Sequence, residues 1–428
     1  MKKVLPRKIS CLSAMIMFCL SGGAAFADAS IVPIGGNVNL TANNVPVVNI
    51  NQPGQDGVSH NQYSQFDVGS QGAVLNNAQG SAQSQLAGAI TANPNLSAGA
   101  AKVILNEINS SDKTLLNGMI EVAGQKADVI VANRSGITCN GCGFINTGTG
   151  VLTTGELQFK DKQFTGYSVT GGTVAFEGKG LQKGDVDYTA VIARAENINA
   201  AVQAKSLLVL AGKKTVTADL TRYINLENKE KSPEVLVDVS QLGGMYAGKI
   251  ILIANENGVG VNDSTPVSLR NNGELVTDGG DMLLSATSLS NAGKIAAGGN
   301  ANLATTVLSN QGDITANNAL NISATSFSNA KNISAKNNID IKSTTTSNSG
   351  TIVSQQGGVT VSDTTFSNNG TIRAKNNISH KGVLFSNNGT LTSTQGSVFN
   401  NGRDINYKPP VVTPPANPWW SSWWSRSW

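Results

Sequence analysis

The sequence contains little of what most enzymes and nucleic-acid-binding proteins depend on. Charged residues make up 14% of its 428 residues and aromatic residues 5%, and it has two histidines and four cysteines. Glycine, in contrast, occurs 46 times, and asparagine is frequent. Because glycine and asparagine accept the positive φ angles of tight turns, this composition disfavours a helical enzyme and predicts short strands joined by turns.

The one long apolar run lies at the amino terminus. Four basic residues between Lys2 and Lys8 precede the run ISCLSAMIMFCLSGGAA, and the small-residue segment AFA ends it at Ala27. This pattern is typical of a secretory signal peptide, so we expect residues 1–27 to be removed by cleavage after Ala27. A retained anchor is the alternative, but the run is short for the roughly 20 apolar residues of a membrane helix.

Removal of the signal peptide also removes the excess positive charge. Without its four basic residues, the chain keeps 27 basic residues for its 27 acidic ones. A protein with no net positive charge has little electrostatic attraction to nucleic acid. The sequence therefore predicts no nucleic-acid partner.

Two cysteines remain after the signal peptide, Cys139 and Cys142 in the segment TCNGCGFIN. Exported thiols tend to oxidise, which favours a local disulfide between them. A zinc site needs about four ligands, and both histidines, His60 and His380, lie far away in the sequence. A redox centre would open a helix, whereas a strand-like stretch follows here. We expect a disulfide, with free thiols, a redox pair or a metal site as open alternatives.

An internal repeat begins at residue 269. Seven similar segments, from LRNNGEL to FSNNGTL, follow one another at intervals of 19 or 20 residues. Apolar and polar residues alternate over short runs, as in β-strands, and the spacing of a leucine-rich repeat is absent. One such unit cannot bury its own apolar side, so neighbouring units must stack. The repeat predicts an all-β solenoid whose coils of 19–20 residues each rise by roughly 4.8 Å.

Three columns of equivalent residues run through the repeat. We expect the asparagine column to pass side-chain hydrogen bonds between coils and the two apolar columns to face the core. His380 falls where the second apolar column places its next residue, so it should point inward as a neutral histidine with a backbone partner. The columns are Asn271, Asn291, Asn310, Asn329, Asn348, Asn368 and Asn387; Leu275, Ile295, Ile314, Ile333, Ile352, Ile372 and Leu391; and Leu283, Leu303, Ile322, Ile341 and Val361.

The regions on either side of the repeat differ from it. Residues 28–268 have a similar composition with irregular spacing, and residues 97–118 are the one segment in which we expect some helix or an insertion. Residues 408–418 form a proline-rich linker, and residues 419–428 hold all five tryptophans. We expect this tail to serve as a terminal anchor; a cap over the last coil and a frayed end are the alternatives.

Three upstream segments resemble the secretion domain of two-partner-secretion exoproteins, the filamentous-haemagglutinin-like adhesins, haemolysins and contact-dependent inhibition proteins of Gram-negative bacteria. They are residues 91–111, 129–155 and 191–212. The resemblance implies a right-handed parallel β-helix, with residues 28–268 as a haemagglutination-activity-like secretion domain and residues 269–407 as haemagglutinin-type repeats. It also implies export across the outer membrane through a pore partner that carries periplasmic POTRA-type domains.

The family's two asparagine motifs map onto this sequence, and the resemblance gives them a role in partner recognition. The first matches in full, whereas the second has Arg134 and Ser135 where the family usually has proline and asparagine. We expect both motifs to form β-turns, but the departure puts side-chain contacts at the second in doubt. The mapped residues are Asn93, Pro94, Asn95 and Leu96 in the first motif, and Asn133, Gly136 and Ile137 in the second.

No segment predicts a catalytic, metal or cofactor site. The carboxylate pairs Asp185/Asp187 and Asp278/Asp281 lie in turn-like segments without a neighbouring histidine or arginine cluster, and catalytic motifs are absent. No toxin-sized segment follows the repeats, which argues against contact-dependent killing by this chain. We expect a non-enzymatic surface adhesin, released or cell-bound, that binds a host or bacterial receptor or glycan. A haemolysin-like cytotoxin and a carbohydrate-active β-helix enzyme are the alternatives.

Overall fold

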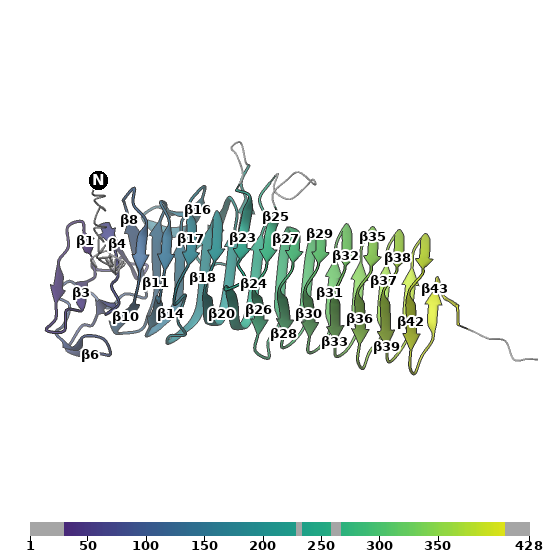
Figure 1. Ribbon diagram of the computed structural model, residues 1–428. Helices are drawn as coiled ribbons and strands as arrows, with labels where there is room; N and C mark the ends of the chain where they lie inside the picture. Colours follow the sequence, from purple (N-terminus) through teal and green to yellow (C-terminus); the bar gives the residue numbers. More distant parts are fainter. Residues whose placement is uncertain (1–29, 228–232, 258–266, 407–428) are drawn as a thin grey trace, which may run out of the picture.

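The chain winds into one long parallel β-helix (Figure 1). The structure is a computed structural model that describes residues 30–227, 233–257 and 267–406. The expected signal peptide, proline-rich linker and tryptophan-rich tail lie outside these residues. The described residues form 44 strands and no helix, and accordingly none of them forms a helix able to span a membrane. The predicted all-β solenoid is confirmed.

The amino-terminal end of the solenoid is closed by antiparallel pairs. Strand β1 pairs with β4, and β2 pairs with β3, which leads into the five-stranded sheet β13-β10-β5-β3-β2. Such pairs cover the free edge of the first coil, which would otherwise invite another strand. The strands of this end are β1 (Ile31–Pro33), β2 (Val38–Leu40), β3 (Pro46–Asn49), β4 (Val58–Phe66), β5 (Ala73–Asn77), β6 (Ala82–Ser84), β7 (Gly88–Ile90), β8 (Val103–Ile108), β9 (Thr114–Leu116) and β10 (Met119–Gly124).

The segment expected to contain some helix is a correction. Residues 97–118 hold strands β8 and β9, which pair in parallel with β11 and β12 of the next coil. Ile104, Leu105 and Leu116 are all buried in these strands. The tertiary pairing with adjacent coils thus overrides the local preference that suggested a helix.

The central coils carry a second, external sheet. Strands β15, β16, β21 and β22 form an antiparallel sheet, and Leu157, Tyr167 and Val216 from it pack on the outer faces of β11, β14, β18 and β20. The strands of this region are β11 (Ala127–Asn133), β12 (Ile137–Cys139), β13 (Gly143–Ile145), β14 (Thr147–Thr153), β15 (Glu156–Lys160), β16 (Gln163–Val169), β17 (Thr173–Phe176), β18 (Val186–Ala193), β19 (Ala195–Ile198), β20 (Ala201–Ala211), β21 (Lys214–Thr217), β22 (Tyr223–Asn225), β23 (Val235–Val239) and β24 (Gly244–Ala254).

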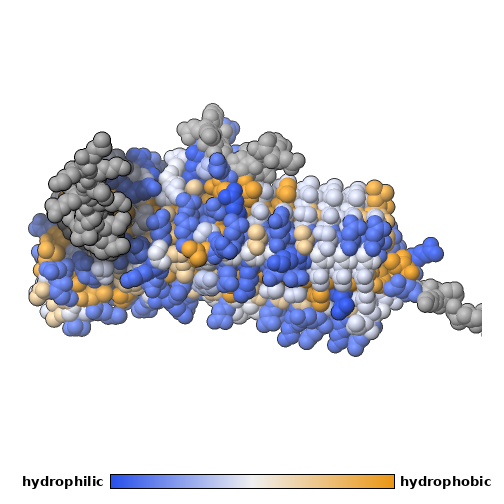
Figure 2. Space-filling view, viewed as in Figure 1, coloured by the Kyte–Doolittle hydropathy of each residue, from blue (hydrophilic) through white to orange (hydrophobic). Residues whose placement is uncertain are grey.

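The repeat coils are far more regular than the central ones. Figure 2 shows residues of similar hydropathy following one another in rows from coil to coil over this half of the molecule. The strands are β25 (Val267–Asn271), β26 (Glu274–Thr277), β27 (Met282–Asn291), β28 (Lys294–Ala297), β29 (Ala301–Asn310), β30 (Asp313–Ala316), β31 (Leu320–Ser323), β32 (Ser326–Asn329), β33 (Asn332–Ala335), β34 (Ile339–Lys342), β35 (Thr345–Asn348), β36 (Thr351–Ser354), β37 (Val359–Ser362), β38 (Thr365–Asn368), β39 (Thr371–Ala374), β40 (Ile378–Lys381), β41 (Leu384–Asn387), β42 (Thr390–Ser393), β43 (Val398–Asn400) and β44 (Arg403–Asp404).

The predicted asparagine ladder is confirmed. Each side-chain Nδ2 group, from Asn271 to Asn368, donates to the Oδ1 atom of the next coil's asparagine at 2.7–2.8 Å. The asparagines up to Asn368 are at most 1% exposed. Buried amides are costly unless they are hydrogen-bonded, and here they satisfy one another along the axis.

The apolar columns are confirmed with one correction. The first column is buried from Leu275 to Ile372, and the second from Leu303 to Val361. Leu283, however, is 38% exposed, and its neighbour Leu284 is the residue that pairs with Leu303. Since side chains alternate between the faces of a strand, an assignment shifted by one residue selects the wrong face.

His380 points inward as predicted and is 3% exposed. Its partners differ from the expected backbone group. Nδ1 lies 2.8 Å from Oδ1 of Asn400, and Nε2 lies 3.0 Å from Oδ1 of Asp363, whose side chain is fully buried. The ring also lies between Phe366 and Phe385. The histidine is therefore held by two side-chain partners within the last coils.

Candidate partner-recognition site

The first asparagine motif is a turn between β7 and β8. The Asn93 side chain is 4% exposed, and its Nδ2 group donates to the backbone oxygens of Ile50 and Asn76 at 3.0 and 2.8 Å. Its Oδ1 atom accepts the backbone N–H of Asn95 at 3.0 Å, which is the geometry of an Asx turn. Leu96 closes the turn through its N–H to the Asn93 oxygen and is buried.

The second motif repeats this geometry between β11 and β12. Asn133 is 1% exposed, and its Nδ2 group donates to the Asp112 oxygen at 2.9 Å and to Thr114 Oγ1 at 3.0 Å. Its Oδ1 atom accepts the backbone N–H of Ser135 at 2.9 Å. Gly136 follows with φ +119°, a conformation that favours glycine. The replacement of proline and asparagine by Arg134 and Ser135 leaves the turn intact.

Burial separates the two halves of each motif. Both asparagines, Leu96 and Ile137 are buried, and each asparagine amide is used up within the protein. Pro94 and Asn95 are exposed in the first turn, and the Arg134 side chain is 69% exposed in the second. Only the exposed residues can touch a partner of the folded domain, whereas the asparagines position them.

The structure places the two turns at separate sites. Pro94 and Asn95 help line a hollow of about 480 Å³, while Arg134 and Ser135 help line another of about 630 Å³. The two hollows share no lining residue. Arg134 lies 3.6 Å from Glu156, measured from Nη1 to Oε2, so its charge is partly balanced at the surface. The motifs thus offer two distinct polar patches and not one composite pocket.

The cysteine pair directly follows the second motif. A disulfide joins Cys139, the last residue of β12, to Cys142, with the Cα atoms 5.3 Å apart. Both side chains are buried within the main core. Oxidation of this pair in the exported protein remains a prediction. The described residues contain no group of histidine, cysteine, aspartate and glutamate side chains able to hold a metal ion.

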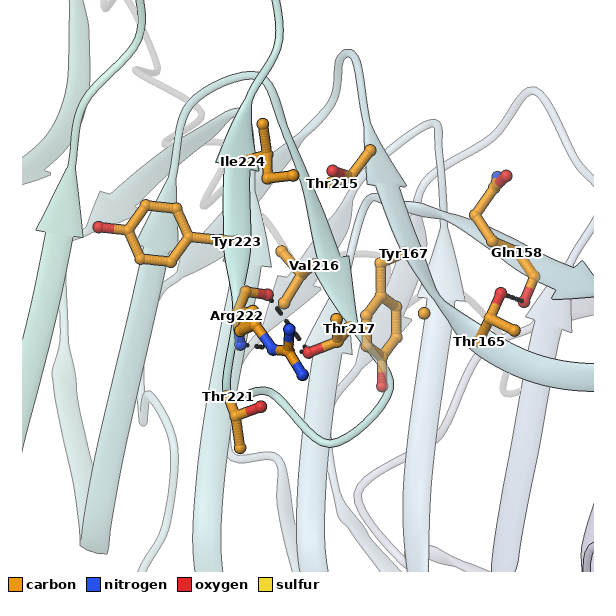
Figure 3. A pocket seen from close by; sticks show the side chains of 11 residues that line it. Gln158, Thr165, Tyr167, Thr215, Val216, Thr217, Thr221, Arg222, Tyr223 and Ile224 are labelled. Atoms are coloured by element: carbon orange, nitrogen blue, oxygen red, sulfur yellow. Dashed lines mark hydrogen bonds between the residues drawn. The ribbon is translucent and has the colours of Figure 1, made fainter.

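The external sheet forms a groove that the sequence did not reveal. Figure 3 shows side chains of β16, β21 and β22 lining a hollow of about 580 Å³. Tyr167 is buried at its floor, where burial raises the pKa of its hydroxyl, while Ile224 is 70% exposed at its rim. Hydrogen bonds from Thr217 and Thr221 lower the Asp219 pKa to about 2 in the neighbouring turn. The signal for this sheet, two short apolar stretches between longer strands, is weak.

A group of buried charges lies beneath the corner that joins β20 to β21. Arg194 donates to Glu256, with Nη2 and Oε1 3.0 Å apart, and Glu256 also accepts the Lys213 N–H. Lys214 is fully buried, and burial lowers its pKa to about 8. Glu196 is 1% exposed, and burial raises its pKa well above the ordinary value, an effect that Lys214 partly opposes. Sequence reasoning missed this group because its members are scattered over 60 residues.

Comparison with known proteins gives the family. The family model described as "TPS secretion domain" matches residues 26–284, which is more than half of the chain. The chain belongs to this family. Proteins of the TPS, or two-partner secretion, route are exported across the outer membrane of Gram-negative bacteria, and the domain implies an outer-membrane partner pore. The predicted resemblance is confirmed, and the protein is a two-partner-secretion exoprotein.

Relatives of this TPS exoprotein include much longer proteins. "Toxin CdiA" of Yersinia pestis is 44% identical over 302 residues, which is 68% of this chain and 9% of that protein. "16S rRNA endonuclease CdiA" of Enterobacter cloacae is 48% identical over 238 residues, covering 55% of this chain and 7% of that protein. The chain thus spans less than a tenth of the length of these curated relatives, and the similarity lies in the secretion domain.

Two solved structures are similar as well. The filamentous hemagglutinin secretion domain is 23% identical with a TM-score of 0.48, covering 87% of this chain and 99% of that one. The HMW1 secretion domain from Haemophilus influenzae is 10% identical with a TM-score of 0.31, covering 87% and 98%.

Proposed function

We propose that this TPS exoprotein is recognised by the POTRA-type domains of its partner pore through the exposed residues of the two asparagine turns. The observation that carries the proposal is the division within each motif. The asparagine amides are buried and bonded within the protein, whereas Pro94, Asn95 and Arg134 point to solvent. The motifs then act by shape, with the buried asparagine holding the exposed residues in place.

After export, we propose that the protein serves as a surface adhesin without catalytic activity. The regular repeats support this role, because a solenoid offers a long continuous surface to a receptor or glycan. The toxin and nuclease names of the relatives describe proteins of which this chain matches less than a tenth. Those names therefore do not favour a toxin activity here.

Secretion of the full chain tests the recognition step. The chain should reach the medium or the cell surface in a strain that produces its partner pore, and accumulate in the periplasm of a strain without it. Arg134→Ala should reduce export several-fold without changing the melting temperature, because it removes an exposed charge and leaves the Asn133 bonds intact. Export without any pore would refute the proposal.

Two further variants separate recognition from folding. Glu156→Ala breaks the same Arg134–Glu156 pair from the other side and should leave export unchanged. Asn133→Ala removes the bonds to Asp112 and Thr114 and should lower the melting temperature and export together. If Arg134→Ala and Glu156→Ala behave alike, Arg134 does not contact the pore.

A further inference from the structure

One inward-facing column of the solenoid contains a single charged residue. The column crosses twelve coils and is formed by side chains that face the core at one register position. Glu196 of β19 is its fourth member, between Val174 of β17 and Val237 of β23. The column runs Thr114, Ile137, Val174, Glu196, Val237, Leu269, Leu289, Leu308, Phe327, Thr346, Phe366 and Phe385.

The Glu196 carboxyl group has no hydrogen-bond partner among the described residues. Both Oε1 and Oε2 are buried and unbonded. Burial of a carboxylate without partners is among the most unfavourable substitutions a core can carry, and the usual response is to take up a proton. Valines hold the equivalent places in both neighbouring coils, so an apolar side chain fits this register.

Few charged groups face Glu196. The residues paired with it on β17 and β23 are valines. From β21, Lys214 approaches, but its Nζ atom donates to the Ala211 oxygen and to Asn255 Oδ1 at 3.4 Å. Glu256, which follows β24, binds Arg194 and the Lys213 N–H. Lys214 is therefore the one cation that acts on Glu196, and it does so without a hydrogen bond.

We propose that Glu196 couples folding of the secretion domain to uptake of a proton, so that this coil folds less readily as the pH rises through neutrality. The geometry requires it, because a carboxyl that water solvates in the unfolded chain enters a column of apolar side chains with neither oxygen bonded. The device sits in the irregular half of the molecule, where the coils are longest.

The direction of the pH dependence follows from linkage. The pKa of Glu196 is raised in the folded protein, so its stabilising contribution is complete below the pKa of the unfolded chain, about 4.3. That contribution is lost as the pH rises toward the folded value. Lys214 behaves oppositely, since its folded pKa is lowered to about 8; its contribution is lost as the pH falls through that value. Between about pH 5 and 7 Lys214 stays mostly protonated in both states, and Glu196 dominates.

Early folding would oppose passage through a pore, so this linkage also has a consequence for export. A chain at neutral pH would keep this coil open longer than one with valine at position 196. This consequence rests on the proposed function, whereas the proton linkage does not. The experiment therefore measures folding of the purified full-length protein alone.

Urea unfolding of the purified protein between pH 5 and pH 7 is the test. In the parent, the unfolding equilibrium constant should rise with pH, by at most about tenfold per pH unit for one proton. Glu196→Gln removes the titrating group, and Glu196→Val matches the neighbouring coils. Both variants should lose that rise, and Glu196→Val should unfold at higher urea than the parent at pH 7 and refold faster.

Glu156→Gln is the matched control, because the Glu156 side chain on β15 is 56% exposed; it should keep the slope of the parent. The proposal is overturned if Glu196→Gln keeps the parent's slope, or if a folded Glu196→Val variant is less stable than the parent at pH 7. Should Glu196→Val fail to fold, the slope of Glu196→Gln decides alone.

Discussion

The secretion domain and the repeats build the same inward column from different chemistry. In the secretion domain the column passes through Cys139, Phe176, Ile198 and Val239, and in the repeats it continues as the ladder from Asn271 onward. Successive members lie 22–41 residues apart in the first half and 19 or 20 apart in the second. Apolar contacts tolerate such variation, whereas a chain of amide bonds needs coils that stack alike.

The two halves also differ in what their extra residues do. The long central coils contribute β15, β16, β21 and β22, which cover the outer apolar face of the helix. The short repeat coils have no residues to spare, and their outer faces carry Ser, Thr and Asn. Irregular length therefore allows elaboration and buried charge, and regular length allows a continuous polar ladder.

Breaking the ladder in its middle should give the largest effect. Asn329→Ala removes two bonds, to Asn310 and Asn348, and leaves the buried Oδ1 atom of Asn348 without its donor. We expect a loss of about 2–4 kcal/mol in the free energy of unfolding, measured by urea denaturation. Asn321→Ala breaks an exposed bond of the same kind, to Asn302, and should cost less than about 0.5 kcal/mol. Equal losses would show that burial does not set the strength of the ladder.

Opening the disulfide should matter less. The Cys139→Ser, Cys142→Ser double variant frees a loop of only a few residues, so we expect a loss of about 1–2 kcal/mol by the loop-entropy model. Export should persist. Mass spectrometry of the exported protein provides the complementary measurement, and finding both thiols free there would contradict the disulfide prediction.

The sequence predicted the repeats well because each coil repeats one environment. The asparagine and isoleucine columns could be read from spacing alone, and a single slip, Leu283 in place of Leu284, arose where the first spacing is ambiguous. The external sheet could not be predicted, since its strands pair with one another across 40 residues of intervening chain. Glu196 was equally hidden, because its burial depends on a register that irregular coils conceal.

The candidate site was predicted in its residues and not in their roles. The motif positions were located from their resemblance, but only the structure shows that Asn93 and Asn133 are buried turn-formers. A short sequence motif does not distinguish a residue that touches a partner from one that shapes the turn. Packing by the neighbouring coil decides between them.

Extending the ladder backwards would sharpen the boundary between the halves. Val239 precedes Asn271 in the column, and the Oδ1 atom of Asn271 has no donor among the described residues. Val239→Asn should supply that donor, so we expect a cost of only about 1 kcal/mol. Ile198→Asn, one coil earlier, gains no such partner and should cost at least about 2–3 kcal/mol. Thermal unfolding of both variants tests the difference, and equal costs would contradict it.

The smallest effect concerns an exposed network in the secretion domain. Hydrogen bonds from Lys126 and Lys205 lower the Asp187 pKa to about 2. A lowered pKa stabilises the fold above the ordinary value near 3.8 and ceases to do so as the pH falls toward 2. Asp187→Asn should therefore lower the urea midpoint slightly at pH 7, with the difference shrinking below pH 3. A constant difference across that range would exclude the network as its cause.

The asparagine ladder gives the solenoid a polarity. Every bond runs from an Nδ2 group to the Oδ1 atom of the following coil, so the side-chain amide dipoles add as a vector along the axis, much as peptide dipoles do in a helix. One end is an unmatched carbonyl on Asn271, and the other is Asn387, whose Nδ2 group donates within its own coil to Gly389. Any coil added beyond Asn387 could lengthen this vector in a head-to-tail orientation, whereas a reversed coil would bring like ends of two dipoles together.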